Sequence, residues 1–187
     1  MDFAEKIETK RLVLERPKPV TFELAKEIYK VVDESRETLK VWLPWPEKVL
    51  QVEDEFIALY NYMDKRWEDK TGFAYLIRLK STNEFLGVID FVEIDEAKKV
   101  AEIGYWLGIY ATGKGYMTEA VFALEAEAFK NGLHRVVIKN DTLNLKSANV
   151  AKNAGYHLDG VMREDRQDVQ TGAFVNTNVW SKLASDK

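Results

Sequence analysis

The 187-residue sequence contains no cysteine and only two histidines. The missing cysteine excludes disulfide bridges, thiolate zinc sites and a cysteine nucleophile. The two histidines, His134 and His157, stand far apart in the sequence, so neither a metal site nor a serine–histidine relay is expected. His134 begins a predicted strand and His157 follows the turn at Gly155 and Tyr156, and we expect both to be packed structural side chains.

Long apolar runs and an excess of positive charge are also missing. No run of 18 apolar residues occurs, so no membrane span is predicted. The charged N-terminal segment MDFAEKIETKR lacks the apolar core of a signal peptide, which favours a cytoplasmic protein. The formal net charge is −4, which gives no reason to expect direct binding of nucleic acid.

The chain does contain enough apolar residues for one hydrophobic core, with 46% hydrophobic and 31% charged residues. This composition suits a single domain over residues 1–187. The hairpin spacing of the middle strands predicts a mainly antiparallel sheet flanked by helices, an α/β (α+β) fold. Strands are expected at 7–15, 73–80, 85–94, 99–109, 134–140 and 156–162, with a last hairpin turning near 171–172, and helices from Thr21 onward and at 52–67, 117–130 and 144–154.

The most informative segment runs from residue 101 to 129. A predicted strand ends there at the glycine-rich turn ATGKGYMT and is followed at once by an amphipathic helix. The unpaired backbone N–H groups at a helix N-terminus bind anions, and phosphate above all. The glycine spacing matches neither a nucleotide-binding P-loop nor a dinucleotide fingerprint. On its own, the turn is equally compatible with a tight turn that binds nothing.

Four motifs in this order place the turn in a family context: EIGYWL, GKGYMTEA, GLHRV and NLKSANVAKNAGYHLDG. Together they resemble the GNAT N-acetyltransferases, and within them the RimJ/RimL branch of ribosomal-protein N-terminal acetyltransferases. The resemblance extends from TKRLVLERP (9–17), through WLPWP (42–46) and FLGVIDF (85–91), to the final hairpin. It therefore covers essentially the whole chain, and it implies a GNAT fold whose sheet splays at an acetyl-CoA site.

The resemblance also implies which residues hold acetyl-CoA. Backbone amides of the turn would surround the pyrophosphate, and the preceding strand would pair with the pantetheine arm. Thr112 and Met117 depart from the usual family residues, which weakens side-chain contacts more than the backbone cradle. The candidate cofactor residues are Trp106, Leu107, Gly108, Thr112, Gly113, Lys114, Gly115, Tyr116, Met117, Thr118, Asn144, Ser147 and Lys152. Lys139 and Lys146 are further candidates for the phosphates, although any single lysine is more simply read as a surface charge.

Acetyl transfer to an amine needs a neutral amine, a stabilised oxyanion and a proton for the leaving thiolate. Without cysteine, we expect direct attack on acetyl-CoA. Many family members place a tyrosine proton donor at the position of Ala151, whereas RimL-like members use a serine one turn earlier, which matches Ser147. The alternative for Ser147 is a place in the first turn of a helix capped by Asn144. Glu102 is the candidate base, unless it faces solvent or pairs with a lysine across the sheet.

The acceptor side is less defined by the sequence. Glu164 and Asp165 are second choices for a group near the acceptor amine, while Trp42 and Trp45 would either line an acceptor slot or form a small satellite core. We expect an acetyl-CoA-dependent N-acetyltransferase acting on a protein N-terminal amine, most readily that of a ribosomal protein. A polyamine, amino-acid or antibiotic acetyltransferase is the alternative. A third reading, suggested by Ala151 and Thr112, is an inactive CoA-binding module. The oligomeric state is left open, with a homodimer as one option.

Overall fold

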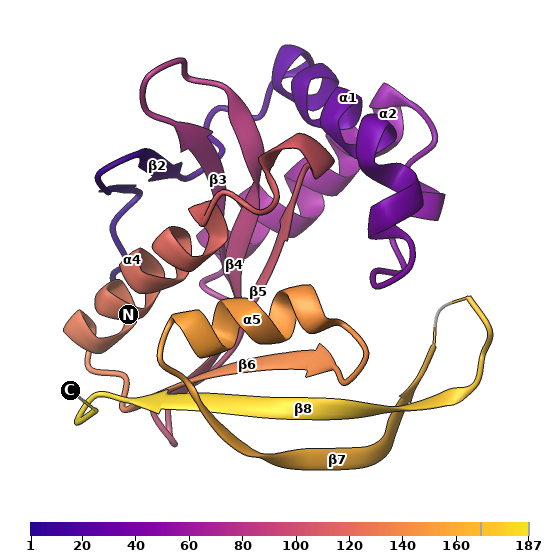
Figure 1. Cartoon of the computed structure of the whole chain (residues 1–187). Helices are drawn as coiled ribbons and strands as arrows, with labels where there is room; N and C mark the ends of the chain where they lie inside the picture. The colour runs from indigo at the N-terminus through magenta and orange to yellow at the C-terminus, as the bar shows by residue number, and fades with distance from the viewer. Residues whose placement is uncertain (169, 187) are drawn as a thin grey trace.

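The computed structural model describes residues 1–168 and 170–186, and its strands form one sheet (Figure 1). The strand order is β1-β2-β3-β4-β5-β6-β8-β7, and every neighbouring pair is antiparallel except β5 and β6. The predicted mainly antiparallel α/β fold is confirmed. The strands are β1 (Lys6–Glu8), β2 (Leu12–Glu15), β3 (Phe73–Leu79), β4 (Phe85–Asp95), β5 (Val100–Leu107), β6 (Arg135–Asp141), β7 (His157–Gln167) and β8 (Phe174–Leu183).

The helices begin largely where the sequence signals indicate. The Thr21 hydroxyl accepts a hydrogen bond from the Leu24 N–H at 3.1 Å, which is the expected N-cap of the first helix. The prolines of the 39–46 segment keep it irregular up to a short 3-10 turn. The helical segments are α1 (Phe22–Leu39), η1 (Pro46–Lys48), α2 (Val52–Ala58), η2 (Leu59–Asp64), α3 (Lys65–Glu68), η3 (Ile109–Ala111), α4 (Tyr116–Lys130) and α5 (Leu145–Asn153).

Two predicted elements are divided in the structure. The expected strand 7–15 is two strands, because Thr9 folds back onto Leu12: its N–H donates to the Leu12 carbonyl, and its hydroxyl accepts from the Leu12 N–H. The expected helix over 52–67 is interrupted by η2, which is a π-helix. None of the described helices is both long and apolar enough to span a membrane. Within residues 1–168 and 170–186 no group of three or more His, Asp or Glu side chains could hold a metal ion.

The sheet separates two hydrophobic cores. Alternation along β5 places Ile103 and Tyr105 on the face packed by α4 and α5, and Gly104 and Trp106 on the face packed by α1 and η2. The first core contains most of the buried apolar residues, including Val121 of α4. The two faces of β5 therefore look into two different chemical environments.

The parallel contact between β5 and β6 is short. Only Val100–Ile103 pair with Arg135–Ile138, although β5 continues to Leu107 and β6 to Asp141. Figure 1 shows β4 and β5 running away from β6, with α5 lying over the place where they part. Along Gly104–Leu107, β5 is paired with β4 alone, so its other edge offers free N–H and C=O groups among the described residues.

Candidate active site

The glycine turn presents a row of unused donors. Gly113 and Gly115 both have φ of +75°, a conformation that favours glycine. The six consecutive N–H groups from Gly113 to Thr118 donate no hydrogen bond within the described chain, and the first helical bond runs from the Glu119 N–H to the Gly115 carbonyl at 3.2 Å. These N–H groups stand at the positive end of the helix dipole of α4, so the turn is built to hold an anion.

Arg11, between β1 and β2, braces this turn from the opposite side. Its guanidinium donates to the Lys114 carbonyl at 3.0 Å and pairs with Glu119 at 2.6 Å. The Thr9 hydroxyl and the Arg11 N–H also donate to Glu119, at 2.6 and 2.8 Å. Arg11 was not predicted from the sequence. The feature that could have indicated it is the polar segment TKR, which interrupts the alternating pattern of a strand.

Ser147 lies on α5, facing the opening between β5 and β6. The Asn144 side chain accepts a hydrogen bond from the Ser147 N–H at 3.1 Å, which confirms the predicted cap. The Ser147 hydroxyl lies 2.9 Å from the Tyr105 hydroxyl of β5, a contact not predicted from the sequence. Burial raises the pKa of Tyr105 to about 12, so this phenol stays protonated. Ala151, one turn later, is fully buried and has no group that can exchange a proton.

Glu102 lies on the other face of β5 and is paired. Its carboxylate contacts the Lys139 ammonium of β6 at 2.6 Å, so the alternative of a lysine partner across the sheet is the one observed. The hydrogen bond that Lys139 donates to Glu102 is the main reason why the pKa of Lys139 is raised, and the charge of Asp165 contributes. Lys139 therefore lies on the face of the sheet opposite Ser147, where it pairs with Glu102 and is not placed to bind a phosphate.

A second carboxylate, Asp90 of β4, is buried on this same face. It is 5% exposed, and its Oδ2 accepts a hydrogen bond from the Tyr62 hydroxyl of η2 at 2.7 Å. Burial raises the pKa of Asp90 to about 6, against the opposing effects of Tyr62 and Arg66. Sequence reasoning missed Asp90, although it is the single charged residue in the otherwise apolar segment FLGVIDF.

Several predicted side chains are engaged within the protein. The Thr112 hydroxyl donates to the Ile109 carbonyl at 2.9 Å, and the Met117 side chain is buried in the first core. The Met117 N–H belongs to the free row of the turn, whereas the Thr112 N–H is bonded to the Ile109 carbonyl at 3.4 Å. Lys114, Lys146 and Lys152 are all exposed, and the Lys152 ammonium lies 5.8 Å from the centre of the Trp180 ring.

The two tryptophans of the segment WLPWP (42–46), Trp42 and Trp45, are both half-buried. The Trp45 ring lies 5.5 Å from the ring of Trp106, and it packs against the second core. Trp45 is thus part of a small aromatic cluster next to the opening of the sheet, as the satellite-core alternative requires. Trp42 follows α1 in the same loop, with its N–H bonded to the Leu39 carbonyl at 3.0 Å.

Glu164 and Asp165 are both exposed, and they lie where β7 bulges away from β8. Glu164 has φ of +51°, and its N–H donates to the Asn176 side chain at 2.9 Å. This part of the hairpin lies near β6, since the Arg166 guanidinium pairs with Asp141 of β6 at 2.8 Å. Of these two second-choice acids, Asp165 acts through its charge on Lys139, the partner of Glu102.

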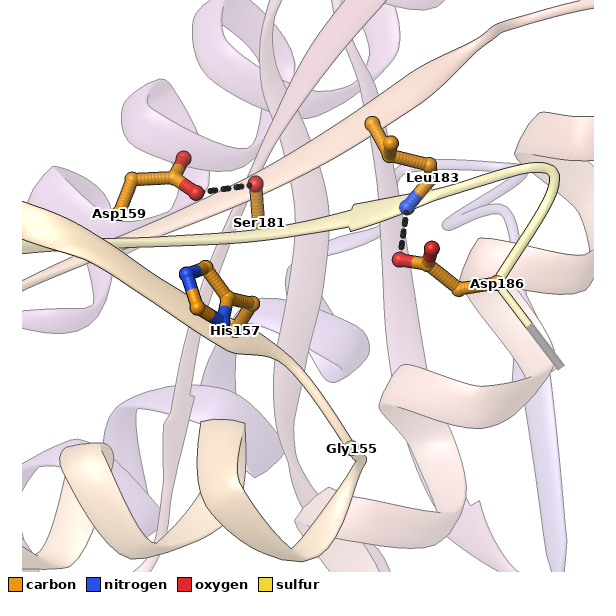
Figure 2. Close-up of a pocket in the computed structure, with 6 residues that line it drawn as sticks. All are labelled: Gly155, His157, Asp159, Ser181, Leu183 and Asp186. Carbon is orange, nitrogen blue, oxygen red and sulfur yellow. Dashed lines mark hydrogen bonds between the residues drawn. The ribbon is translucent and has the colours of Figure 1, made fainter.

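The expectation of packed histidines is wrong, because His134 and His157 are both exposed. His157 begins the outermost strand, β7, which among the described residues pairs only with β8 and is exposed along nearly all its length. Figure 2 shows His157 beside a surface hollow, where the Ser181 hydroxyl donates to Asp159 at 2.9 Å and the Leu183 N–H donates to Asp186 at 2.8 Å.

Known proteins resemble this chain both in sequence and in architecture. Residues 11–157 match the family model described as acetyltransferase (GNAT) domain. A ribosomal-protein-serine acetyltransferase of Escherichia coli is 28% identical over 159 residues, which cover 84% of this chain and 86% of that protein.

Solved structures agree with this match. The microcin self-immunity acetyltransferase MccE, in complex with acetyl-CoA and AMP, has a TM-score of 0.84 and 28% identity, covering 94% of this chain and 93% of that one. RimL, a ribosomal alpha-N-protein acetyltransferase in complex with coenzyme A, has a TM-score of 0.86 and 25% identity, covering 97% and 100%. The chain with the free glycine turn and the splayed sheet therefore belongs to the GNAT acetyltransferase family and is an N-acetyltransferase.

Proposed function

We propose that this chain transfers the acetyl group of acetyl-CoA directly to a primary amine, and that its preferred acceptor is the N-terminal α-amine of a protein. The observation that carries the donor half of this proposal is the row of six free N–H groups from Gly113 to Thr118, next to the unpaired edge of β5. Bound acetyl-CoA supplies a thioester, whose acyl carbon an amine can attack.

The residues present fit the two parts of CoA. The turn offers backbone donors to the pyrophosphate, with the exposed ammonium groups of Lys114 and Lys152 as additional cations. The free edge of β5 at Trp106 and Leu107 offers strand-like partners to the pantetheine amides. The Gly108 N–H is bonded to the Leu86 carbonyl at 2.8 Å, so only its carbonyl remains for such a contact.

Ser147 and Tyr105 support the departure of the thiolate. The Ser147 hydroxyl, held on the first turn of α5 by the Asn144 cap, donates a proton to the leaving sulfur. The Tyr105 hydroxyl, 2.9 Å away, donates a hydrogen bond to the Ser147 oxygen as the serine proton leaves, and the serine then regains a proton from solvent. The raised pKa of Tyr105 keeps this phenol protonated as a hydrogen-bond donor at neutral pH. This pair takes the place of the tyrosine proton donor that many family members have at the position of Ala151. Its presence favours an active enzyme over an inactive CoA-binding module.

The acceptor class rests on relatives and on shape. Both RimL and the Escherichia coli relative are named for ribosomal proteins, which supports a protein N-terminus. The hollow lined by Glu93, Glu102 and Lys139 on the acceptor face is open to solvent. A pocket dedicated to a small amine would instead be enclosed. The small-amine alternative keeps support from MccE, whose structure holds AMP.

A thiol-release screen separates these acceptor classes. Peptides with N-terminal Ser, Ala or Met would be compared with polyamines and amino acids at equal concentration. We expect turnover with peptides and at least tenfold lower kcat/KM for the small amines. The reverse order would transfer the proposal to small amines, and binding of acetyl-CoA without thiol release for any amine would support the inactive module.

Acetyl-CoA binding itself is tested by thermal stability. At about one hundred times its dissociation constant a ligand stabilises the native state by about 2.7 kcal/mol, which corresponds to roughly 5–10 °C for a chain of this size. Gly115→Trp should abolish this rise by filling the turn. The matched control is Gly132→Trp, at the other end of α4, where φ is +83° and an added Cβ meets nothing within 4 Å. An equal rise in both variants would refute the assignment of the turn.

A further inference from the structure

Asp90 occupies a position that the proposed function has not used. It pairs with Gly104 of β5, and Gly104 is the first residue after the last β5–β6 pair at Ile103. Its carboxylate is therefore at the point where the sheet opens, on the acceptor face, while Ser147 faces the same opening from the α5 side. A buried carboxylate at this point of an acyl-transfer site calls for a reason.

Gly104 provides the space for this carboxylate. A Cβ at position 104 would come within 2.9 Å of Asp90 Oδ1 and within 2.5 Å of Val92 Cγ2. Oδ1 thus lies directly against the β5 backbone at the opening. Across residues 1–168 and 170–186 no donor is hydrogen-bonded to Oδ1, whereas Oδ2 accepts from Tyr62. One oxygen is held and the other is available to a reactant.

The π-helix η2 connects Asp90 with the surface. Tyr62 is 45% exposed while Asp90 is 5% exposed, and their hydrogen bond is 2.7 Å long. π-Helices are rare, and they occur frequently at functional sites. The charged and titratable groups that face Asp90 are Tyr62 and Arg66 from the helical side and Glu102 from β5. The Arg66 guanidinium lies 4.7 Å from the Tyr62 ring.

We propose that Asp90 accepts the proton that the acceptor amine loses during acyl transfer, which rests on the proposed function. As the amine nitrogen bonds to the acyl carbon, its proton passes to Asp90 Oδ1, directly or through one water molecule. The carbon–sulfur bond breaks, and the sulfur takes a proton from Ser147. Asp90 then releases its proton to solvent and Ser147 regains one from solvent, so one proton leaves and one enters, while Tyr62 donates its hydrogen bond to Oδ2 throughout. Glu102, fixed by Lys139, acts on Asp90 through its charge.

The test combines an isosteric variant with two variants that shift the titration. Asp90→Asn should lower kcat/KM by about 10²–10⁴-fold and leave the acetyl-CoA-dependent rise in melting temperature unchanged. Tyr62→Phe removes a hydrogen bond that lowers the pKa of Asp90, so the acidic limb of the kcat/KM profile should move to higher pH. Glu102→Gln removes a nearby negative charge that raises the pKa of Asp90, so the limb should move to lower pH.

A measurement on the free protein complements the kinetics. Carbon-13 NMR of a protein labelled only at its aspartate carboxyl groups should show a resonance that titrates well above the usual aspartate range and disappears in Asp90→Asn. Full activity in Asp90→Asn, loss of the acidic limb in Glu102→Gln, or an ordinary titration of Asp90 would each overturn the proposal while the proposed function stands. A wild-type chain that binds acetyl-CoA but acetylates no amine would overturn the proposed function, and this role with it.

Discussion

Glu55 should destabilise the native state at neutral pH. It lies on α2, is 5% exposed and has no side-chain hydrogen bond or ion pair within the described part of the chain. Burial raises its pKa from 4.5 to about 7. An unfolded chain loses the Glu55 proton near pH 4.5, whereas the native chain keeps it up to about pH 7. Stability is therefore lost as the pH rises through this window, and the loss is complete above it.

The magnitude follows from the two pKa values. Their difference, at about 1.4 kcal/mol per pKa unit, amounts to about 3 kcal/mol at pH 8. Glu55→Gln removes this penalty and leaves a neutral side chain of the same size. We expect it to raise the melting temperature by roughly 6–12 °C at pH 8 and by little at pH 4.5.

Differential scanning calorimetry from pH 4.5 to 8 measures this difference directly. The matched control is Glu53→Gln, an exposed residue of the same helix, for which no such pH-dependent gain is expected. A Glu55→Gln variant whose gain is the same at both pH values, or which is less stable at pH 8, would refute the reasoning, because it would mean that the ionised carboxylate finds a partner.

Three further predictions concern the site. Ser147→Ala should lower kcat about 10²-fold with the calorimetric affinity for acetyl-CoA within about twofold of the wild type; Tyr105→Phe should lower kcat less, and full activity in Ser147→Ala would remove the serine from the mechanism. Arg11→Ala should cost less than about 1 kcal/mol of stability, since its ion pair is exposed, yet weaken acetyl-CoA binding several-fold by freeing the Lys114 carbonyl; unchanged binding would show that the turn needs no brace. Trp45→Ala should lower the melting temperature and raise KM for the acceptor, and a change in the first alone would confine Trp45 to packing.

Local signals account for what the sequence predicted well. The cap at Thr21, the glycines at 113 and 115 and the alternation of β3 to β5 each act within a few residues of the chain. They determine where elements begin and end whatever the surrounding fold. The Asn144 cap followed the same logic, and its hydrogen bond to Ser147 is present.

Partners distant in the chain account for what it missed. Asp90 meets Tyr62, and Glu102 meets Lys139, only once β4, β5, β6 and η2 have taken their places in the fold. The π-helix cannot be recognised in the sequence, because its apolar residues recur at the spacing of an ordinary α-helix. The exposure of His157 depends on β7 being the outermost strand, and strand order is not encoded in local alternation.

The position of β8 between β6 and β7 imposes an order on assembly during synthesis. Within residues 1–168 and 170–186, β7 has no strand partner except β8, and β6 keeps an open edge until β8 is in place. Translation from Asp141 to Leu183 takes roughly two to eight seconds at typical rates. For that interval the platform beneath α5 is incomplete, although the glycine turn has already been made. A nascent chain would thus hold its donor-binding segment before it could present Ser147 on a stable support, so premature acetyl transfer on the ribosome is not expected.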